Sequence, residues 1–459
     1  MKLKAAARQW SNYLLAEINP AGLVSFRIVF GLIMSLDMLL YLLMNRVHSK
    51  YIDPQFLFLY IHSMARPAPA LLEALFAALA VAALFMAIGL FYRFSAWFFC
   101  LGLTYIFLLD RAQYLNHMYL MCLLSLLLAV SQAGHCFSLD NYLRKNPNLP
   151  VPRWNHFILR FQLFVVYLYG AIWKLNPDWL RGEPQRFWFT NRAAEPFIGG
   201  IVSQEWFVWL VTYGGILTDF TLPFLLIFPR TFWYGVAIAT FFHTTNSLLF
   251  DIGVFPWLML GTIVLFPPPD WPYKAASRLS VWLKGPVILP EVSVQEGGQA
   301  LKTNWKQLAA LVFVHVYMIF HVVFPLRHFL YPGNVDWNEE GYYFAWRMML
   351  HHKEAQLVIY KEDPASGDIS VVDTHDLLTR RQRMIMKQRP ELIHQFCVWL
   401  ADREEKRTGK RPRITVRSTA SLNKHQWQEL IDPKVDLGAE KFSLDHKSWI
   451  VDMKEEGKP

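Results

Sequence analysis

Long runs of apolar residues, separated by short polar segments, occupy residues 22–326 of the chain. Because about 20 apolar residues cross the core of a bilayer, this pattern predicts about nine membrane-spanning helices. The expected spans are residues 22–44, 70–91, 94–110, 114–135, 156–174, 206–228, 231–246, 248–266 and 306–326. The spans at 231–246 and 248–266 are short and adjacent, so a broken or re-entrant helix is an alternative there.

The two ends of the chain depart from this pattern. Residues 1–19 form an amphipathic lead-in with Lys2, Lys4 and Arg8, and they lack the cleavage site of a secretory signal. After residue 326, short strand-like segments occur at 356–360, 368–373 and 413–417. The turn residues at 363–367 predict a hairpin between the first two strands, and a helix is expected over about 375–406, with Gly409 just beyond its end.

These patterns predict a polytopic α-helical membrane protein with a small extramembrane α+β domain. We expect the helical transmembrane domain to cover residues 1–326 and the α+β domain to cover residues 327–459. Composition agrees, because the chain is 54% hydrophobic and only 18% charged, whereas soluble domains carry about 25% charged residues. It excludes a disordered chain, and four cysteines are too few for a disulfide scaffold.

The basic residues indicate an orientation rather than a nucleic-acid partner. The net charge is +9, but no basic stretch alternates with aromatic residues. Loops at Arg93, 136–155, Arg230 and 267–305 are richer in Lys and Arg than the others, which places the N-terminus in the cytoplasm and the C-terminal domain outside. The chain has no Asn-x-Ser/Thr site, which favours a bacterial inner membrane.

Known catalytic and metal-binding motifs are absent from the sequence. It contains no Walker loop, no GxGxxG after a strand, and no GxSxG, HExxH or CxxC motif. We therefore expect no metal site. Four ionisable residues fall inside predicted spans, where we expect structural pairing between helices: Arg27, Asp37, Arg160 and Asp219.

Polar residues from separate spans are predicted to lie at one depth, near the outer membrane face. Asn116 and His117 begin one span, Lys174 ends another, and His243 and Asn246 lie in the outer third of a third. Each has a structural alternative, because a lysine at a helix end often extends to the lipid headgroups and a histidine often bonds a backbone carbonyl.

Tryptophans accompany these polar residues, at Trp173, Trp179, Trp206, Trp209 and Trp257. They are either an interfacial aromatic belt or the walls of a site for a flat aromatic ligand. A quinone that enters from the lipid would suit such a site.

Five dispersed segments resemble the vitamin K-dependent γ-glutamyl carboxylase family. They are Tyr167 to Gly182, with the sequence YLYGAIWKLNPDWLRG, then 242–255, 116–119, 341–351, and 432–436 with 448–449. The likeness covers nearly the whole chain, in order. The N-terminal region also resembles a wider bacterial group that shares the HTTM membrane domain.

The resemblance implies a reaction on peptide glutamate. In the family, an amine deprotonates vitamin K hydroquinone, and reaction with O2 yields a base strong enough to remove the γ-proton. Carbon dioxide then adds, and the quinone leaves as its epoxide. The implied cofactor is reduced vitamin K, of the menaquinone type in a bacterium, and the implied partners are a glutamate-containing peptide or protein and the lipid bilayer.

The family motifs assign roles to residues of this chain. Lys174 matches the amine, which a dry aromatic pocket would keep uncharged. The full implied set is Lys174, His117 and His243 as catalytic residues; Asn116, Trp173 and Asn246 at the cofactor; and Tyr342, Tyr343, Trp346, Arg347, His351 and Lys353 at the substrate. Arg347 and Lys353 are the candidates to pair with the substrate carboxylate.

Two departures from the family pattern bear on these roles. Trp173 stands where animal members have a second basic residue beside the key lysine. Animal members also extend further at the C-terminus, so the resemblance does not imply propeptide recognition.

Two other functions remain open at this level. One is a quinone epoxidase or oxidase that does not carboxylate. The other is a non-catalytic transporter or maturation chaperone, in which Lys174 only extends to the headgroups. The sequence does not indicate the oligomeric state, the peptide or the quinone.

Overall fold

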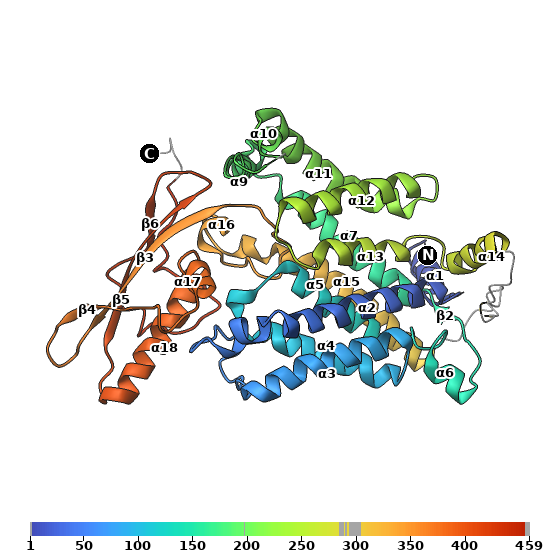
Figure 1. Ribbon diagram of the computed structural model, residues 1–459, viewed down its shortest axis with the longest axis horizontal. Coiled ribbons are helices and arrows are strands. Elements are labelled where there is room, and N and C mark those ends of the chain that lie inside the picture. The colour runs from blue at the N-terminus through green and yellow to red at the C-terminus, as the bar shows by residue number, and fades with distance from the viewer. Residues whose placement is uncertain (1, 197, 284–288, 290–291, 293–303, 455–459) are drawn as a thin grey trace.

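A bundle of long helices and a sheet-containing region lie at opposite ends of the molecule (Figure 1). The computed structural model describes residues 2–196, 198–283, 289, 292 and 304–454. The N-terminus lies at the end of the bundle that is far from the sheet (Figure 1). There, two short antiparallel strands, β1 (Glu17–Ile18) and β2 (Val151–Pro152), join the chain before the first long helix to the chain before the fifth apolar run.

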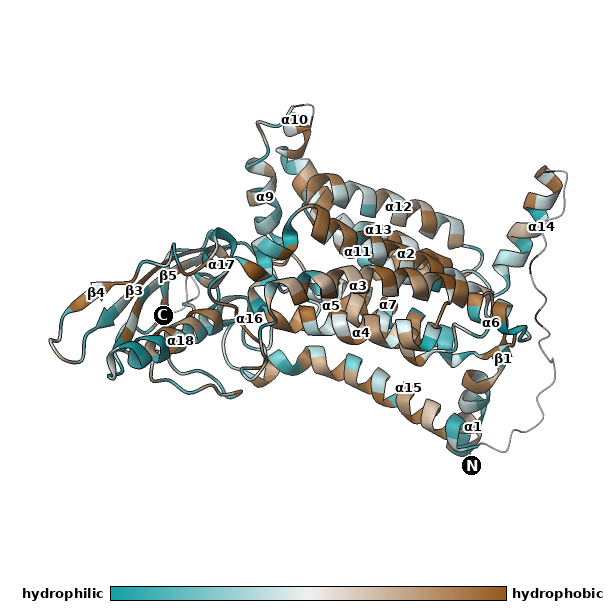
Figure 2. Cartoon of the chain, turned by 60° about the horizontal axis from the view of Figure 1, so that its bottom comes forward, coloured by the Kyte–Doolittle hydropathy of each residue, from teal (hydrophilic) through white to brown (hydrophobic). Residues whose placement is uncertain are grey.

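Six helices of the described chain are long and apolar enough to cross a membrane. They are α2 (Ala21–Leu43), α3 (Pro69–Ile88), α4 (Tyr92–Leu109), α7 (Trp154–Trp173), α11 (Glu205–Ile227), and α15 (Trp305–Val323) with the 3-10 turn that follows it to Leu330. Large apolar side chains on their outer surfaces are exposed, as expected for helices in contact with lipid. Figure 2 shows this concentration of hydrophobic residues in the bundle.

The other three predicted spans form shorter or less apolar helices. Residues 114–135 form α5 (Asn116–Val130), whose 15 residues extend roughly 22 Å and fall short of a bilayer core of about 30 Å. Residues 231–246 lie in α12 (Phe232–Leu249), and residues 248–266 form α13 (Phe255–Thr262) with a 3-10 turn at Ile263–Leu265. The nine predicted spans are therefore not confirmed.

Short helices lie at both ends of the bundle. Those at the end far from the sheet are α1 (Lys2–Leu15), α6 (Leu139–Arg144) and α14 (Trp271–Leu283) (Figure 1). Toward the sheet lie α9 (Glu183–Thr190), α10 (Gly199–Val202) and α16 (Val335–Asn338), and α8 (Pro177–Leu180) follows α7. The predicted lead-in is thus helix α1.

The buried arginines of the bundle bind backbone carbonyls. Arg27 is fully buried and donates to the carbonyl oxygens of Ala87, Ala133, Cys136 and Phe137 at 2.6–3.3 Å. The guanidinium of Arg160 donates to three carbonyls in the 265–267 turn. These two arginines therefore hold loop and helix-end carbonyls, which lack intrahelical partners, rather than pairing with charged residues of other helices as predicted.

The sheet has four antiparallel strands in the order β4-β3-β5-β6. They are β3 (Lys353–Glu362), β4 (Ile369–Val371), β5 (Arg413–Leu422) and β6 (Gln428–Ile431), and β3 and β5 pair over ten residues. The three predicted strands and the β3–β4 hairpin are confirmed. The four-residue β6 was not predicted, because its apolar pattern is too short to recognise.

The predicted helix at 375–406 is two helices, α17 (Arg380–Met386) and α18 (Pro390–Thr408). Proline disfavours a helical residue before it, and Arg389 is extended, with φ −124° and ψ 105°. Helix α18 ends at Gly409, which has φ +76°, as the sequence indicated. Its buried residues Leu392, Phe396 and Leu400 form a core with the inner face of the sheet.

Asp110 ties the bundle to the sheet-containing region. The carboxylate directly follows α4 and accepts hydrogen bonds from the backbone N–H of Ala112 (2.9 Å) and Phe58 (3.3 Å). Its other oxygen accepts from Nε2 of Gln382 on α17 (3.3 Å). Burial, partly offset by these hydrogen bonds, raises the pKa of Asp110 to about 7.

This carboxyl group predicts a pH dependence of stability. The folded group keeps its proton to a higher pH than the unfolded group, whose pKa is about 3.9, so its contribution to stability is lost as the pH rises toward about 7. We expect Asp110→Asn, which is uncharged at every pH, to flatten the fall in unfolding temperature between about pH 4 and pH 7. Thermal unfolding in detergent measures this, and equal pH dependence of variant and wild type would contradict it.

Candidate functional site

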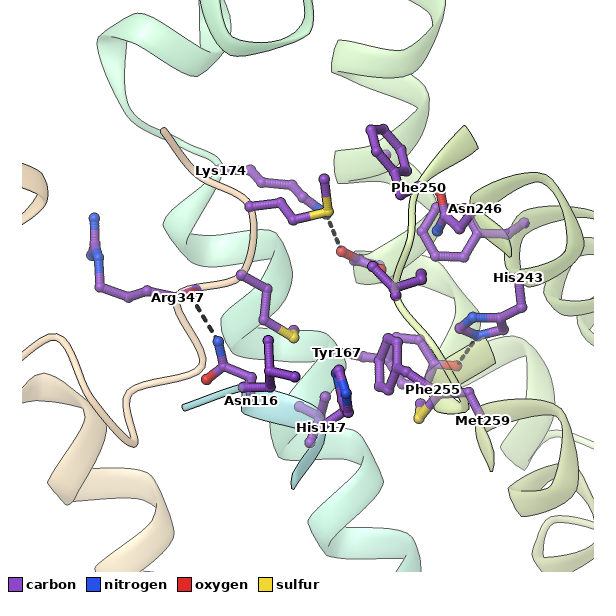
Figure 3. A pocket seen from close by; sticks show the side chains of 18 of the residues that line it. Asn116, His117, Tyr167, Lys174, His243, Asn246, Phe250, Phe255, Met259 and Arg347 are labelled. Carbon is purple, nitrogen blue, oxygen red and sulfur yellow. Dashed lines mark hydrogen bonds and ion pairs between the residues drawn. The ribbon is translucent and has the colours of Figure 1, made fainter. Parts of the chain in front are cut away.

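A cavity of about 300 Å³ lies where the bundle meets the sheet-containing region. This is at the lower end of the range of small-molecule sites, roughly 300–1,000 Å³. Most of its wall is apolar, and the aromatic and sulfur-containing residues include Trp179, Trp188, Phe242, Phe250, Phe255 and Met259. Figure 3 shows polar side chains from several elements directed toward the same space.

Lys174 enters this cavity from the end of α7. The helix stops there because Asn176 precedes Pro177 and adopts an extended conformation that caps α8. The lysine is only 9% exposed, and its ammonium nitrogen lies 5.3 Å from the centre of the Trp179 ring. The side chain therefore does not extend freely into solvent.

Asp219 of α11 is the partner of Lys174. The Lys174 Nζ forms an ion pair with Asp219 Oδ2, and both side chains are buried (Figure 3). Gly170 makes room for the pair, because a Cβ there would lie 3.1 Å from Asp219 Oδ2, closer than an ordinary contact. Two membrane helices, α7 and α11, are joined by this contact.

His243 of α12 lines the cavity and contacts Tyr167 through its ring. Its Nε2 is 2.9 Å from the hydroxyl of Tyr167, whereas its buried Nδ1 has no hydrogen-bond partner among the described residues. Tyr167 precedes Lys174 by two helical turns, so both lie on one face of α7. Asn246 follows His243 by three residues on α12 and also lines the cavity.

Asn116 connects the start of α5 to the loop that follows α16. Its Oδ1 accepts from the hydroxyl of Tyr114 (2.9 Å), and its Nδ2 donates to the carbonyl of Arg347 (2.9 Å). The Tyr114 hydroxyl also accepts from the N–H of Phe344 (2.7 Å). Asn116 thus lines the cavity and holds the loop. The neighbouring His117 also lines it and packs beside Phe255, with ring centres 5.7 Å apart.

The loop from 339 to 349 has an unusual backbone. Glu339, Phe344, Trp346 and Met349 have φ between +50° and +60°, a region that such side chains rarely adopt, and Gly341 has φ +74°. Strained residues of this kind persist only where surrounding contacts hold them, and they are concentrated at functional sites.

Two of the six predicted substrate residues reach the cavity. Tyr342 and Arg347 line it, and the Tyr342 hydroxyl donates to the Arg347 carbonyl (3.1 Å). Arg347 donates through Nε and Nη2 to the two oxygens of Asp336, at 3.2 and 2.7 Å. Burial opposes the charged form of Asp336, but Arg347 and His351 outweigh it and hold the pKa of this carboxyl well below its usual range.

The other predicted substrate residues and Trp173 support the loop and are not among the residues that line the cavity. Trp346 stacks on Tyr119 at 4.9 Å, and Trp173 donates to the carbonyl of Ala345 (2.6 Å). Tyr343 accepts a hydrogen bond from Arg389 (3.0 Å). These contacts fix the path of the loop, so their role in ligand binding remains a prediction.

His351 and Lys353 have protein partners of their own. His351 Nδ1 is 3.2 Å from Asp336, and Lys353 donates to the carbonyls of Trp337 (2.8 Å) and Gln388 (3.0 Å) and to Glu339 (3.0 Å). Burial lowers the pKa of Lys353, and Glu339 opposes this effect. All three ammonium donors are used, so the predicted contact of Lys353 with a substrate would require one of them to be exchanged.

Three residues of the site had not been assigned to it from the sequence. Asp219 had been noted only as a residue that pairs between helices, and Tyr167 and Arg389 line the cavity as well. The helical spacing between Tyr167 and Lys174 could have predicted that both residues face the cavity. No local pattern in the sequence could have predicted Arg389, because this residue is far from the others in the chain and only the folded structure brings it to the cavity.

Two family models match the chain. The HTTM domain model matches residues 15–271, and the model of the vitamin K-dependent gamma-carboxylase lumenal domain matches residues 306–456. The comparison with solved structures gives no match. The first match covers most of the bundle and of the cavity, and the second covers nearly all of the last long helix, α15, with the loop and the sheet.

The two matches cover more than half of the chain, and residues from both line the cavity. The chain therefore belongs to the vitamin K-dependent gamma-carboxylase family, with an HTTM domain followed by the lumenal domain of that family.

Proposed function

We propose that the protein is an integral-membrane carboxylase that couples epoxidation of vitamin K hydroquinone to γ-carboxylation of peptide glutamate. The observation that carries this proposal is the buried Lys174–Asp219 pair, which lines one cavity with His243 and with Tyr342 and Arg347 of the lumenal domain. The family supports a vitamin K-dependent carboxylase activity. The coupling, the co-substrates O2 and CO2, and the peptide belong to the proposal.

The cavity fits a reduced quinone of the menaquinone type. Its aromatic walls match a flat ring, and His243 Nδ1 and Asn246 offer polar contacts to ring oxygens. His117 lies against Phe255 on the same wall and is a third candidate. When bound, reduced vitamin K supplies, after deprotonation and reaction with O2, the base that removes the γ-proton before CO2 adds.

Lys174 is the group that removes the hydroxyl proton in this proposal. An amine accepts a proton only when it is uncharged, and the Asp219 carboxylate is the partner of Lys174 in the ion pair. Transfer of the lysine proton to the carboxylate leaves an amine and an acid that are both neutral, and burial favours such a pair over two charges. Asp219 thus receives the proton that Lys174 must lose before it can act.

The snorkelling alternative finds little support in this geometry. A lysine that reaches the headgroups would be exposed, whereas Lys174 is buried and paired within the bundle. An epoxidase without carboxylation would not need the lumenal domain, but here Tyr342 and Arg347 of that domain complete the cavity.

We further propose that the cavity faces the extracytoplasmic side of a bacterial inner membrane. The match of residues 306–456 to a lumenal domain supports this side for the sheet. The basic residues Lys2, Lys4 and Arg8 lie in α1, at the opposite end of the bundle, which supports a cytoplasmic N-terminus (Figure 1).

The role of Lys174 predicts the loss of both activities together. We expect Lys174→Ala to reduce hydroquinone epoxidation and incorporation of labelled CO2 into a glutamate peptide by about 100-fold or more, the usual range for a general base. The exposed Lys306 of α15 gives the control variant Lys306→Ala, which should retain both activities. Assays in nanodiscs measure both products. Full activity of Lys174→Ala would contradict the role, and epoxide without labelled peptide in the wild type would contradict carboxylation.

The glycine beside Asp219 gives a second test. An Ala at position 170 puts a methyl group 3.1 Å from Asp219 Oδ2, so the carboxylate must shift and the lysine with it. Because small displacements of catalytic groups are costly, we expect Gly170→Ala to lower kcat by about tenfold, although alanine favours a helix over glycine. Gly214→Ala on α11, where a Cβ meets nothing within 4 Å, is the matched control. Equal kcat in the two variants would show that the pair is not the base.

A further inference from the structure

We propose that Arg389 binds the γ-carboxylate of the substrate glutamate, an inference that rests on the proposed function and identifies the substrate-binding cation of that site. The site would thereby select anionic glutamate side chains over neutral glutamine. No motif indicated this residue; the fold brings it to the cavity from the start of α18.

The position of Arg389 follows from the break between α17 and α18. Pro390 keeps Arg389 in an extended conformation just before α18. The Arg389 side chain reaches the cavity from this position. It lies with Tyr342 and Arg347 among the residues that line this wall. With Met348 and Met349, these are the residues that the lumenal domain contributes to the cavity, so a peptide held by that domain would meet Arg389 here.

The guanidinium has donors to spare. Its Nη1 donates to the hydroxyl of Tyr343 (3.0 Å), and its Nε lies 3.3 Å from Glu339 Oε2. Within the described chain, its Nη2 has no hydrogen-bond partner. Burial opposes the charge, but Tyr343 and Glu339 outweigh it and raise the pKa of Arg389 above its ordinary value, so the group stays cationic.

The two other cations are less available. Arg347 donates through Nε and Nη2 to Asp336. Lys353 donates all three of its N–H groups to protein acceptors and does not line the cavity. A carboxylate binds best to a planar fork with two free N–H groups. Arg347 already makes such a two-point contact with Asp336, whereas Arg389 makes none among the described residues.

The local charge balance also calls for one anion. The buried groups at this wall are three cations and two carboxylates, namely Arg347, Lys353, Arg389, Asp336 and Glu339. The next pair outward, Arg111 with Glu391, adds no net charge. One excess positive charge away from bulk water is costly, and a bound γ-carboxylate would offset it.

The test compares binding of a glutamate peptide with binding of its glutamine analogue. Full-length protein in nanodiscs is titrated with each peptide without hydroquinone, and the ratio of the two Kd values is taken for each variant. We expect the wild type to prefer glutamate by roughly 10- to 100-fold, the range for a charge-assisted hydrogen bond, and Arg389→Gln to lose that preference. Arg389→Lys should keep part of it, since the charge remains and the fork is lost.

Arg111→Gln is the matched control, because Arg111 is an ion-paired arginine of the same interface that does not line the cavity. It should keep the wild-type ratio. The ratio is independent of the amount of folded protein, so partial unfolding cannot mimic the result. An unchanged ratio in Arg389→Gln overturns the inference while leaving the carboxylase proposal standing. A wild type that binds with the expected ratio but never carboxylates overturns only the proposed function.

Discussion

The buried ion pair between Lys174 and Asp219 constrains the rest of the site. Two charges within a membrane bundle are costly unless they meet each other, so α7 and α11 must approach closely enough for the contact to form. Glycine at 170 leaves the space that the Asp219 carboxylate occupies. The same contact keeps the amine away from the headgroups and beside an aromatic cavity, where a proton can pass within the pair without separating charge.

A second constraint acts from the lumenal side. The 339–349 loop keeps its left-handed residues because the membrane domain holds its backbone. Asn116 donates to the Arg347 carbonyl, and Trp173 donates to the Ala345 carbonyl. The Tyr114 hydroxyl accepts from the N–H of Phe344. Residues that family resemblance associates with ligands thus also build the wall of the site. This arrangement accounts for the meeting of a membrane domain and a sheet-containing domain at one cavity.

Elements that follow from local periodicity were predicted well from the sequence. The direction in which a given side chain points was predicted poorly. Apolar runs located the long helices, and alternation located β3, β4 and β5. Trp173 and Lys174 cannot both face the cavity, because neighbouring residues on a helix point about 100° apart. Lys353 begins a strand whose alternate residues Ala355 and Ile359 face the core, so it is buried as well, and a sequence does not say which face of a strand is inside.

Long-range partners were the largest gap in the sequence-based prediction. Lys174, His117, His243, Asn116 and Asn246 were placed at one depth, and they do line one cavity. The pairing of Asp219 with Lys174 and the arrival of Arg389 depend on contacts between residues far apart in the chain, which no local pattern encodes. The short α5 and α13 likewise depend on where neighbouring segments end, so apolar runs overstated the number of spans.

The most direct test of the central claim is an experimental structure of the protein in nanodiscs with reduced menaquinone under anaerobic conditions. The account predicts a quinone oxygen within about 2.6–3.2 Å of Lys174 Nζ, with the Asp219 carboxylate on the other side of the amine. A ring bound elsewhere, with the lysine nitrogen turned toward lipid phosphates, would contradict it.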